Sequence, residues 1–155
     1  MKILLNGVNY FPELTGIGKY SGELATWLAG KGHEVRVVTA PPYYPEWRIG
    51  PGYSASMYDC ETSAGVDVWR CPLWVPAKPS GLKRLVHLAT FAVSSLPAML
   101  RQAFWRPDVV WVVAPAFFSA PGAWLTARLS AAPVWLHVQD YEVDAAFDLG
   151  LLKGA

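Results

Sequence analysis

Charged residues are scarce in this chain: 16% of its 155 residues are Asp, Glu, Lys or Arg, whereas ordinary domains carry about 25%. Hydrophobic residues make up 53%, and this composition excludes a disordered tail, a collagen-like repeat and a coiled coil. Neither sign of charge is in excess, because 13 Lys and Arg residues face 12 Asp and Glu residues. We therefore expect no nucleic-acid partner.

Cysteine is also scarce. Cys60 and Cys71 are the two cysteines of the sequence, and they form neither a CxxC pair nor part of a His/Cys cluster. Two isolated thiols make no disulfide framework and no metal-ligand set, which is typical of a protein in a reducing compartment.

Long hydrophobic runs are missing as well. Residues 85–100 lack charge, but this stretch is shorter than the about 20 apolar residues that a membrane-spanning helix needs. The apolar start at 1–5 is broken by Asn6 and Gly7, so it does not resemble a signal peptide. We expect a cytosolic protein that is able to touch a membrane.

Short apolar runs alternate with helical patterns, as in a parallel α/β sheet. The patterns predict strands at 2–8, 34–39, 66–71, 109–113 and 134–138, helices at 17–30, 81–105 and 119–130, and a further helix around 145–152. Residues 41–64 are rich in Pro, Gly and Tyr and are predicted to form a long loop. The expected fold is an α/β, Rossmann-like three-layer domain whose parallel sheet has the order 3-2-1-4-5.

Two glycines stand at the start of the first predicted helix. Ligands of open α/β sheets bind beyond the carboxyl ends of the strands, where Gly16 and Gly18 would expose backbone N–H groups to a phosphate. Lys19 would add a positive charge. The alternative is that the glycines merely turn the chain. The dinucleotide fingerprint fails because Ser21 holds its third glycine position, so a nicotinamide dinucleotide is not expected.

Polar residues follow the last predicted strand, and they are His137, Gln139, Asp140, Glu142 and Asp144. Such groups at the end of an apolar strand are costly unless they are used or solvated. Asp140 is a candidate for orienting a sugar hydroxyl or acting as a base. The alternatives are that Asp140 or Asp144 caps the next helix and that His137 is a core histidine.

An aromatic, proline-rich loop at 41–47 follows the second strand and includes Tyr43 and Tyr44. Aromatic faces suit sugar rings and lipid interfaces. The alternative is a lid that packs on the core of its own domain.

The helix predicted at 81–105 carries Lys83, Arg84 and Arg101 and no acidic residue. A basic helix with a broad apolar surface is able to lie in a membrane interface. The alternative is an ordinary crossover helix that covers the sheet.

Several segments, at 10–20, 32–35, 39–45, 69–76 and 136–144, resemble the family 4 glycosyltransferases. The last two resemble the branch of colanic-acid (exopolysaccharide) fucosyltransferase-like enzymes. The resemblance implies a GT-B fold, in which two Rossmann-like domains face each other across a cleft. Residues 1–155 would form the N-terminal, acceptor-side domain, and the C-terminal donor domain would lie outside this chain.

The resemblance further implies transfer of a hexosyl group from a GDP- or UDP-linked nucleotide-sugar to a lipid-linked saccharide acceptor, with retention and without metal or cofactor. Gly16, Gly18 and Lys19 would meet the donor diphosphate, Asp140 would be catalytic, and Tyr43, Tyr44, Gln139, Glu142 and Asp144 would bind acceptor and sugar. Family members often have a histidine directly before the acid, where this chain has Gln139.

Two other functions compete with this interpretation. One is a non-catalytic module that binds a membrane or a saccharide, and the other is a small dinucleotide enzyme, which the missing glycine and ribose-binding acid disfavour. Turnover of a nucleotide-sugar would separate the enzyme from the binding module. The 155-residue chain by itself is expected to be inactive.

Overall fold

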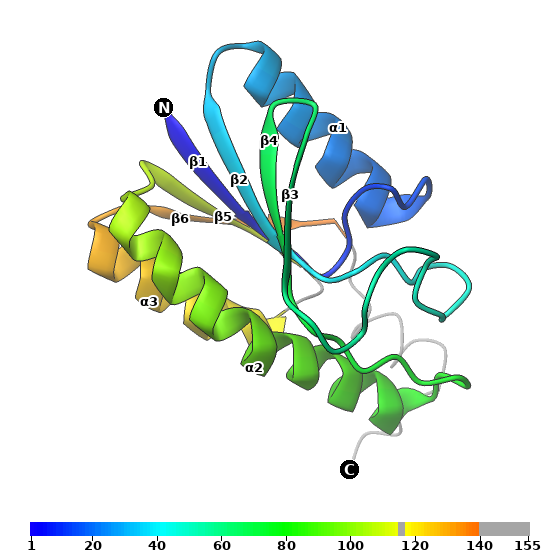
Figure 1. Cartoon of the computed structure of the whole chain (residues 1–155). Coiled ribbons are helices and arrows are strands. Elements are labelled where there is room, and N and C mark those ends of the chain that lie inside the picture. The colour runs from blue at the N-terminus through cyan, green and yellow to red at the C-terminus, as the bar shows by residue number, and fades with distance from the viewer. Residues whose placement is uncertain (115–116, 140–155) are drawn as a thin grey trace.

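The computed structural model describes residues 1–114 and 117–139 (Figure 1). In chain order the elements are β1 (Lys2–Asn6), α1 (Gly16–Gly30), β2 (Glu34–Thr39), β3 (Asp59–Ser63), β4 (Val66–Arg70), α2 (Gly81–Trp105), β5 (Val109–Ala114), the short helix η1 (Phe117–Ser119), α3 (Ala120–Ser130) and β6 (Val134–Val138). The predicted helix around 145–152 lies outside the described residues.

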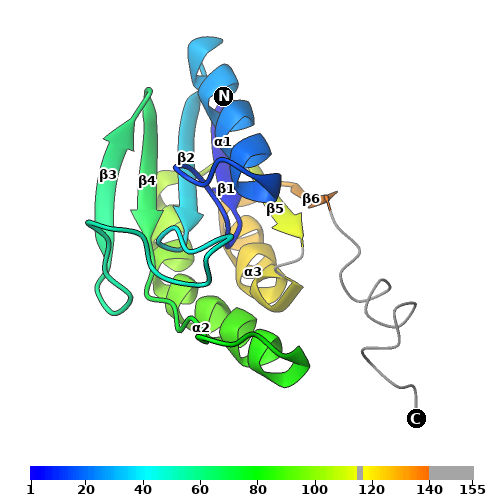
Figure 2. The same cartoon turned by 90° about the vertical axis from the view of Figure 1, so that its right-hand side faces the viewer.

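The described strands form one sheet in the order β3-β4-β2-β1-β5-β6. All neighbouring pairs are parallel except β3 and β4, which are antiparallel. Figure 2 shows this order with α1 in front of the sheet. The predicted order 3-2-1-4-5 corresponds to β4-β2-β1-β5-β6 and is confirmed. The fold is thus a Rossmann-like α/β domain with one added edge strand.

That edge strand corrects the prediction that 41–64 is entirely loop. Residues Asp59–Ser63 form β3, which is mostly exposed and carries no apolar alternation. A two-residue turn joins β3 to β4, and Ala64 and Gly65 in it have positive φ angles of 52° and 78°. This is the backbone conformation that matches the twist of a tight hairpin. The hairpin forms because of its turn and its partner strand, which hydropathy does not reveal.

The core lies in two layers because side chains alternate along the buried strands. Ile3 and Leu5 of β1 pack on the α1 side, together with Ala25 of that helix. Leu4 points to the other side and belongs to a cluster that includes Phe91 of α2. In Figure 1, α1 covers one face of the sheet and α2 and α3 cover the other. This arrangement leaves the carboxyl ends of the strands to the connecting loops.

Candidate functional site

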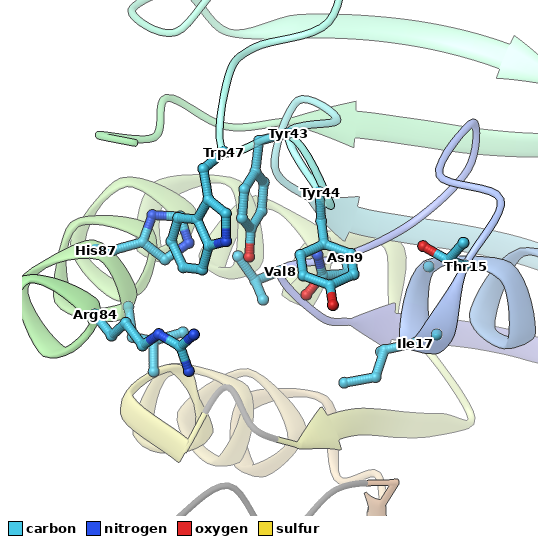
Figure 3. A pocket seen from close by; sticks show the side chains of 12 residues that line it. Val8, Asn9, Thr15, Ile17, Tyr43, Tyr44, Trp47, Arg84 and His87 are labelled. Atoms are coloured by element: carbon cyan, nitrogen blue, oxygen red, sulfur yellow. The ribbon is translucent and has the colours of Figure 1, made fainter. Parts of the chain in front are cut away.

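A cavity of about 190 Å³ lies at the carboxyl end of β1, where three segments converge (Figure 3). Its walls are the first turn of α1, the aromatic loop 41–47 and the start of α2. The lining residues are Val8, Asn9, Thr15, Gly16, Ile17, Gly18, Tyr43, Tyr44, Trp47, Arg84, His87 and Leu88. The structure therefore brings together Gly16, Gly18, Tyr43 and Tyr44, which the sequence singled out separately.

The α1 wall presents the start of a helix without a side-chain cap. Thr15 is extended and its side chain makes no capping hydrogen bond, and the first turn of α1 has no acidic residue. Gly16 has a positive φ of 54°, a conformation that favours glycine. The first N–H groups of a helix have no partner inside the helix and carry partial positive charge. This wall is thus suited to an anionic group.

Gly18 has a packing role in the same turn. A Cβ at this position would lie 2.6 Å from Cβ and 2.6 Å from Oε2 of Glu13. Its backbone φ is not positive, so the need for glycine comes from the neighbouring carboxylate and not from the turn. Lys19, the third residue assigned to the donor diphosphate, does not line the cavity. Its ammonium lies 3.8 Å from the carboxylate of Glu23 on the exposed side of α1.

The aromatic wall comes from the loop after β2. Tyr43 is buried, and its ring lies 5.6 Å from that of Trp47 and 4.6 Å from that of His87, measured between centroids. Tyr44 is 43% exposed. Figure 3 shows Tyr44 between this cluster and Thr15 of the α1 end. Tyr43 therefore combines the two interpretations of the loop, since it packs on the core and also lines the cavity, while Tyr44 is free to meet a ligand.

The α2 wall holds a neutral histidine. Nδ1 of His87 lies 2.7 Å from the carbonyl oxygen of Trp74, so Nδ1 carries the proton and donates it. Its Nε2 is buried and finds no hydrogen-bond partner among the described residues. Burial lowers the pKa of His87, and Arg84 lowers this pKa further, against the opposing effect of the Trp74 carbonyl. The ring is therefore uncharged at neutral pH.

Arg84 supplies the positive charge of the cavity. Its guanidinium lies 5.3 Å from the centroid of Trp47, in cation–π geometry. Within the described ranges it forms no ion pair with a carboxylate. The sequence pattern predicts a membrane-facing position for Arg84, together with Lys83. The structure separates these neighbours, because Lys83 does not line the cavity.

Glu13 is a buried carboxylate beside this cavity and was not singled out by the sequence. Its Oε1 accepts hydrogen bonds from the backbone N–H groups of Tyr43 at 2.9 Å and Tyr44 at 3.0 Å, and its Oε2 accepts one from Asn9 at 2.8 Å. Burial raises the pKa of Glu13, and these hydrogen bonds and the charge of Arg70 oppose the rise. The side chain is 4% exposed, so its charge is balanced chiefly by backbone amides.

The residues predicted after the last strand are only partly described. Asp140, Glu142 and Asp144 lie outside the described residues. Gln139 directly follows β6 and is half-buried. His137 is half-buried near the end of β6, and its ring centroid lies 5.5 Å from that of Trp111. Nδ1 of His137 has no hydrogen-bond partner among the described residues, and the interpretation as a core histidine stays a prediction.

Trp47, Arg84 and His87 also line the cavity, although the sequence pattern assigns none of the three to ligand binding. A weak signal exists for His87, because it stands four residues before Phe91 and so shares the sheet-facing side of α2. Nothing in the sequence places the start of α2 beside the loop at 41–47. Among the described residues, no group of three His, Cys, Asp or Glu side chains is placed to hold a metal ion.

Comparisons with known proteins identify the family of this chain. Residues 15–155 match the family model described as a glycosyl transferase 4-like domain. The chain is 60% identical over 151 residues to the protein named as the colanic acid biosynthesis glycosyl transferase WcaI of Escherichia coli (strain K12). The match covers 97% of this chain and 37% of that relative. The chain therefore belongs to the glycosyl transferase 4-like family.

Proposed function

We propose that this chain is the acceptor-side domain of a nucleotide-sugar-dependent glycosyltransferase with a GT-B architecture, acting in exopolysaccharide assembly. The observation that carries the proposal is the cavity in which an uncapped helix N-terminus faces an aromatic wall and an unpaired guanidinium, within the described residues. The name of the E. coli relative supports colanic acid as the polysaccharide. A second, donor-side domain would complete the cleft.

The α1 wall is proposed to face the diphosphate of a GDP- or UDP-linked donor. Charge develops on this leaving group as the sugar departs, and preorganised donors aimed at it lower the barrier. The backbone N–H groups around Gly16 and Gly18 supply such donors without a metal or cofactor. Arg84 adds a positive charge from the opposite wall. Lys19 pairs with Glu23 outside the cavity, and we assign it no contact with the donor in this arrangement.

The aromatic wall is proposed to bind the acceptor. Tyr44 and Trp47 offer flat apolar surfaces next to the helix N-terminus, which suits a sugar ring lying beside a phosphate. Asp140, with Gln139, Glu142 and Asp144, is carried over by the family resemblance as the polar group that would face sugar and acceptor. The expected outcome is transfer of a hexosyl group with retention of configuration to a lipid-linked saccharide.

A lipid-linked acceptor requires the enzyme to work at a membrane surface, and α2 fits that requirement. The helix has no acidic residue, and Leu82 and Val93 on it are 74% and 75% exposed. Lys83 and Arg101 are exposed on the same helix. None of the described helices is long and apolar enough to cross a bilayer. We therefore propose peripheral binding to the cytoplasmic face of the inner membrane through α2.

The test is nucleotide release by the two-domain enzyme with a panel of GDP- and UDP-linked sugars and lipid-linked acceptors. Arg84→Ala should lower kcat/KM about tenfold or more, because it removes a charge-assisted contact to a phosphate. Lys19→Ala is the matched control and should have a much smaller effect, since Lys19 pairs with Glu23 outside the cavity. Equal effects of the two changes would contradict the proposed roles of the walls.

The 155-residue chain provides a second test. Without the donor domain it should transfer no sugar. Its affinity for GDP or UDP should be weak, because a few backbone contacts do not offset the cost of association. Calorimetry with both nucleotides checks this expectation. Micromolar binding by the isolated chain, or turnover by it, would contradict the two-domain proposal.

A further inference from the structure

Two buried side chains of opposite charge tie the loop after β1 to the loop after β2. Glu13 binds the backbone of the second loop, because one of its carboxylate oxygens accepts hydrogen bonds from the N–H groups of both Tyr43 and Tyr44. Its other oxygen accepts the side-chain amide of Asn9. The loop segment around Tyr43 is thereby fixed at two consecutive backbone positions. Glu13 therefore fixes the backbone from which the side chains of Tyr43 and Tyr44 project.

Arg70, at the end of β4, holds the same two loops by their carbonyl groups. Its guanidinium donates to the carbonyl oxygens of Phe11 at 2.6 Å and Ala40 at 3.0 Å. Glu61 on β3 pairs with it at 2.6 Å, and Arg70 is 3% exposed. The two loops are thus joined on one side through carbonyls and on the other through amides.

The side of the joint that contains Glu13 belongs to the ligand cavity. Tyr43, Tyr44 and Asn9, the three partners of Glu13, all line it. The carboxylate also fills the space beside Gly18 in the opposite wall. Glu13 therefore stands between the helix end proposed for the donor phosphate and the aromatic wall proposed for the acceptor. Removing its carboxylate would leave two amides of the loop without their acceptor.

We propose that Glu13 is a positioning residue that fixes the distance between the aromatic wall and the start of α1, and so determines how an acceptor sugar is held. The inference rests on the proposed function of the cavity. Glu13 does not line this cavity and is 4% exposed, so it would act without contact to a ligand bound there. Its effect on the reaction passes through Tyr43 and Tyr44.

Amide hydrogen exchange in the 155-residue chain tests the hydrogen bonds from Tyr43 and Tyr44 to Glu13, and this measurement does not depend on enzyme activity. Glu13→Ala should speed exchange of the Tyr43 and Tyr44 amides about tenfold or more, because their acceptor is gone. Glu13→Gln keeps a carbonyl oxygen and should preserve most of the protection. The amide of Val37, in the core of β2, reports global stability and should change much less than the two loop amides. If Glu13→Ala does not fold, Glu13→Asp, which is one methylene shorter, takes its place.

The positioning role is tested in the two-domain enzyme. Glu13→Asp should raise the KM for the acceptor about tenfold, whereas kcat and the KM for the donor should change much less. Glu23→Gln is the matched control, because it removes a carboxylate on exposed α1 that touches neither loop. An unchanged exchange rate at Tyr43 and Tyr44, or equal effects on donor and acceptor, overturns the proposal. An inactive wild-type enzyme would overturn the proposed function, while the exchange rates would still show whether Glu13 holds the amides of Tyr43 and Tyr44.

Discussion

Gly18 leaves the space that the Glu13 carboxylate occupies: a Cβ at position 18 would lie 2.6 Å from Oε2 of Glu13. A glycine in a phosphate-binding turn is normally explained by the approach of the ligand. Here the Glu13 side chain by itself leaves no room for a Cβ at position 18. The glycine of the α1 turn and the buried acid of the preceding loop therefore form one packing unit, and a change in either should disturb both walls of the cavity.

Gly18→Ala should destabilise the protein by about 1–3 kcal/mol, the usual cost of overfilling a packed site. The clash is with Cβ of Glu13 as well as its oxygen, so a rotation of the carboxylate alone does not relieve it. Denaturant unfolding measures the loss. Gly30→Ala is the control, because nothing lies within 4 Å of a Cβ at that position in the last turn of α1. Equal stability of the two variants would contradict the packing role.

His87 should make stability depend on pH. Burial lowers its pKa below the ordinary value of 6.5, so the folded state binds its proton less readily than the unfolded state. The contribution of neutral His87 to the free energy of unfolding is present above pH 6.5 and is lost as the pH falls through the folded-state pKa. The difference in unfolding free energy between wild type and His87→Phe, followed from about pH 8 to 5, isolates this effect. A difference that does not change with pH would contradict it.

The two cysteines should differ sharply in reactivity. Cys60 is exposed on β3, whereas Cys71 is buried at 0% exposure. Burial raises the pKa of Cys71 to about 12, which leaves almost no thiolate to react. A thiol reagent should therefore label Cys60 in the folded protein and Cys71 only after unfolding. Cys60→Ser should abolish labelling of the native state, and residual rapid labelling of that variant would show that Cys71 is accessible.

The membrane proposal predicts salt-sensitive binding to vesicles. A basic residue near anionic lipid contributes roughly 1 kcal/mol, and this attraction is screened by salt. Lys83→Glu with Arg101→Glu should weaken co-sedimentation with anionic vesicles at low salt. Lys19→Glu with Lys31→Glu is the control, because it reverses the same number of charges on α1 and at its C-cap, across the sheet from α2 (Figure 1). Equal losses in both variants would indicate an electrostatic attraction that is not specific to α2.

The arrangement of the regular elements was largely determined by the sequence. β2, α2 and β6 begin and end at the predicted residues, because buried parallel strands and long amphipathic helices leave strong hydropathy patterns. β3 was not predicted, because it has no such hydropathy pattern. Its residues are mostly exposed and polar, so the strand exists through the hairpin turn and its hydrogen bonds to β4. Hydropathy reports burial, and an exposed edge strand has little of it.

The residues of the candidate site were also only partly predictable from the sequence. Gly16, Tyr43 and Tyr44 could be singled out from the sequence because glycines and aromatic residues are conspicuous in loops at a sheet edge. Only the tertiary structure decided which charged groups accompany them. Arg84 faces the cavity while its neighbour Lys83 does not, because successive residues of a helix point about 100° apart. Glu13 reaches the amide of Tyr43 across 30 positions of the chain, and only folding brings such groups within hydrogen-bond distance.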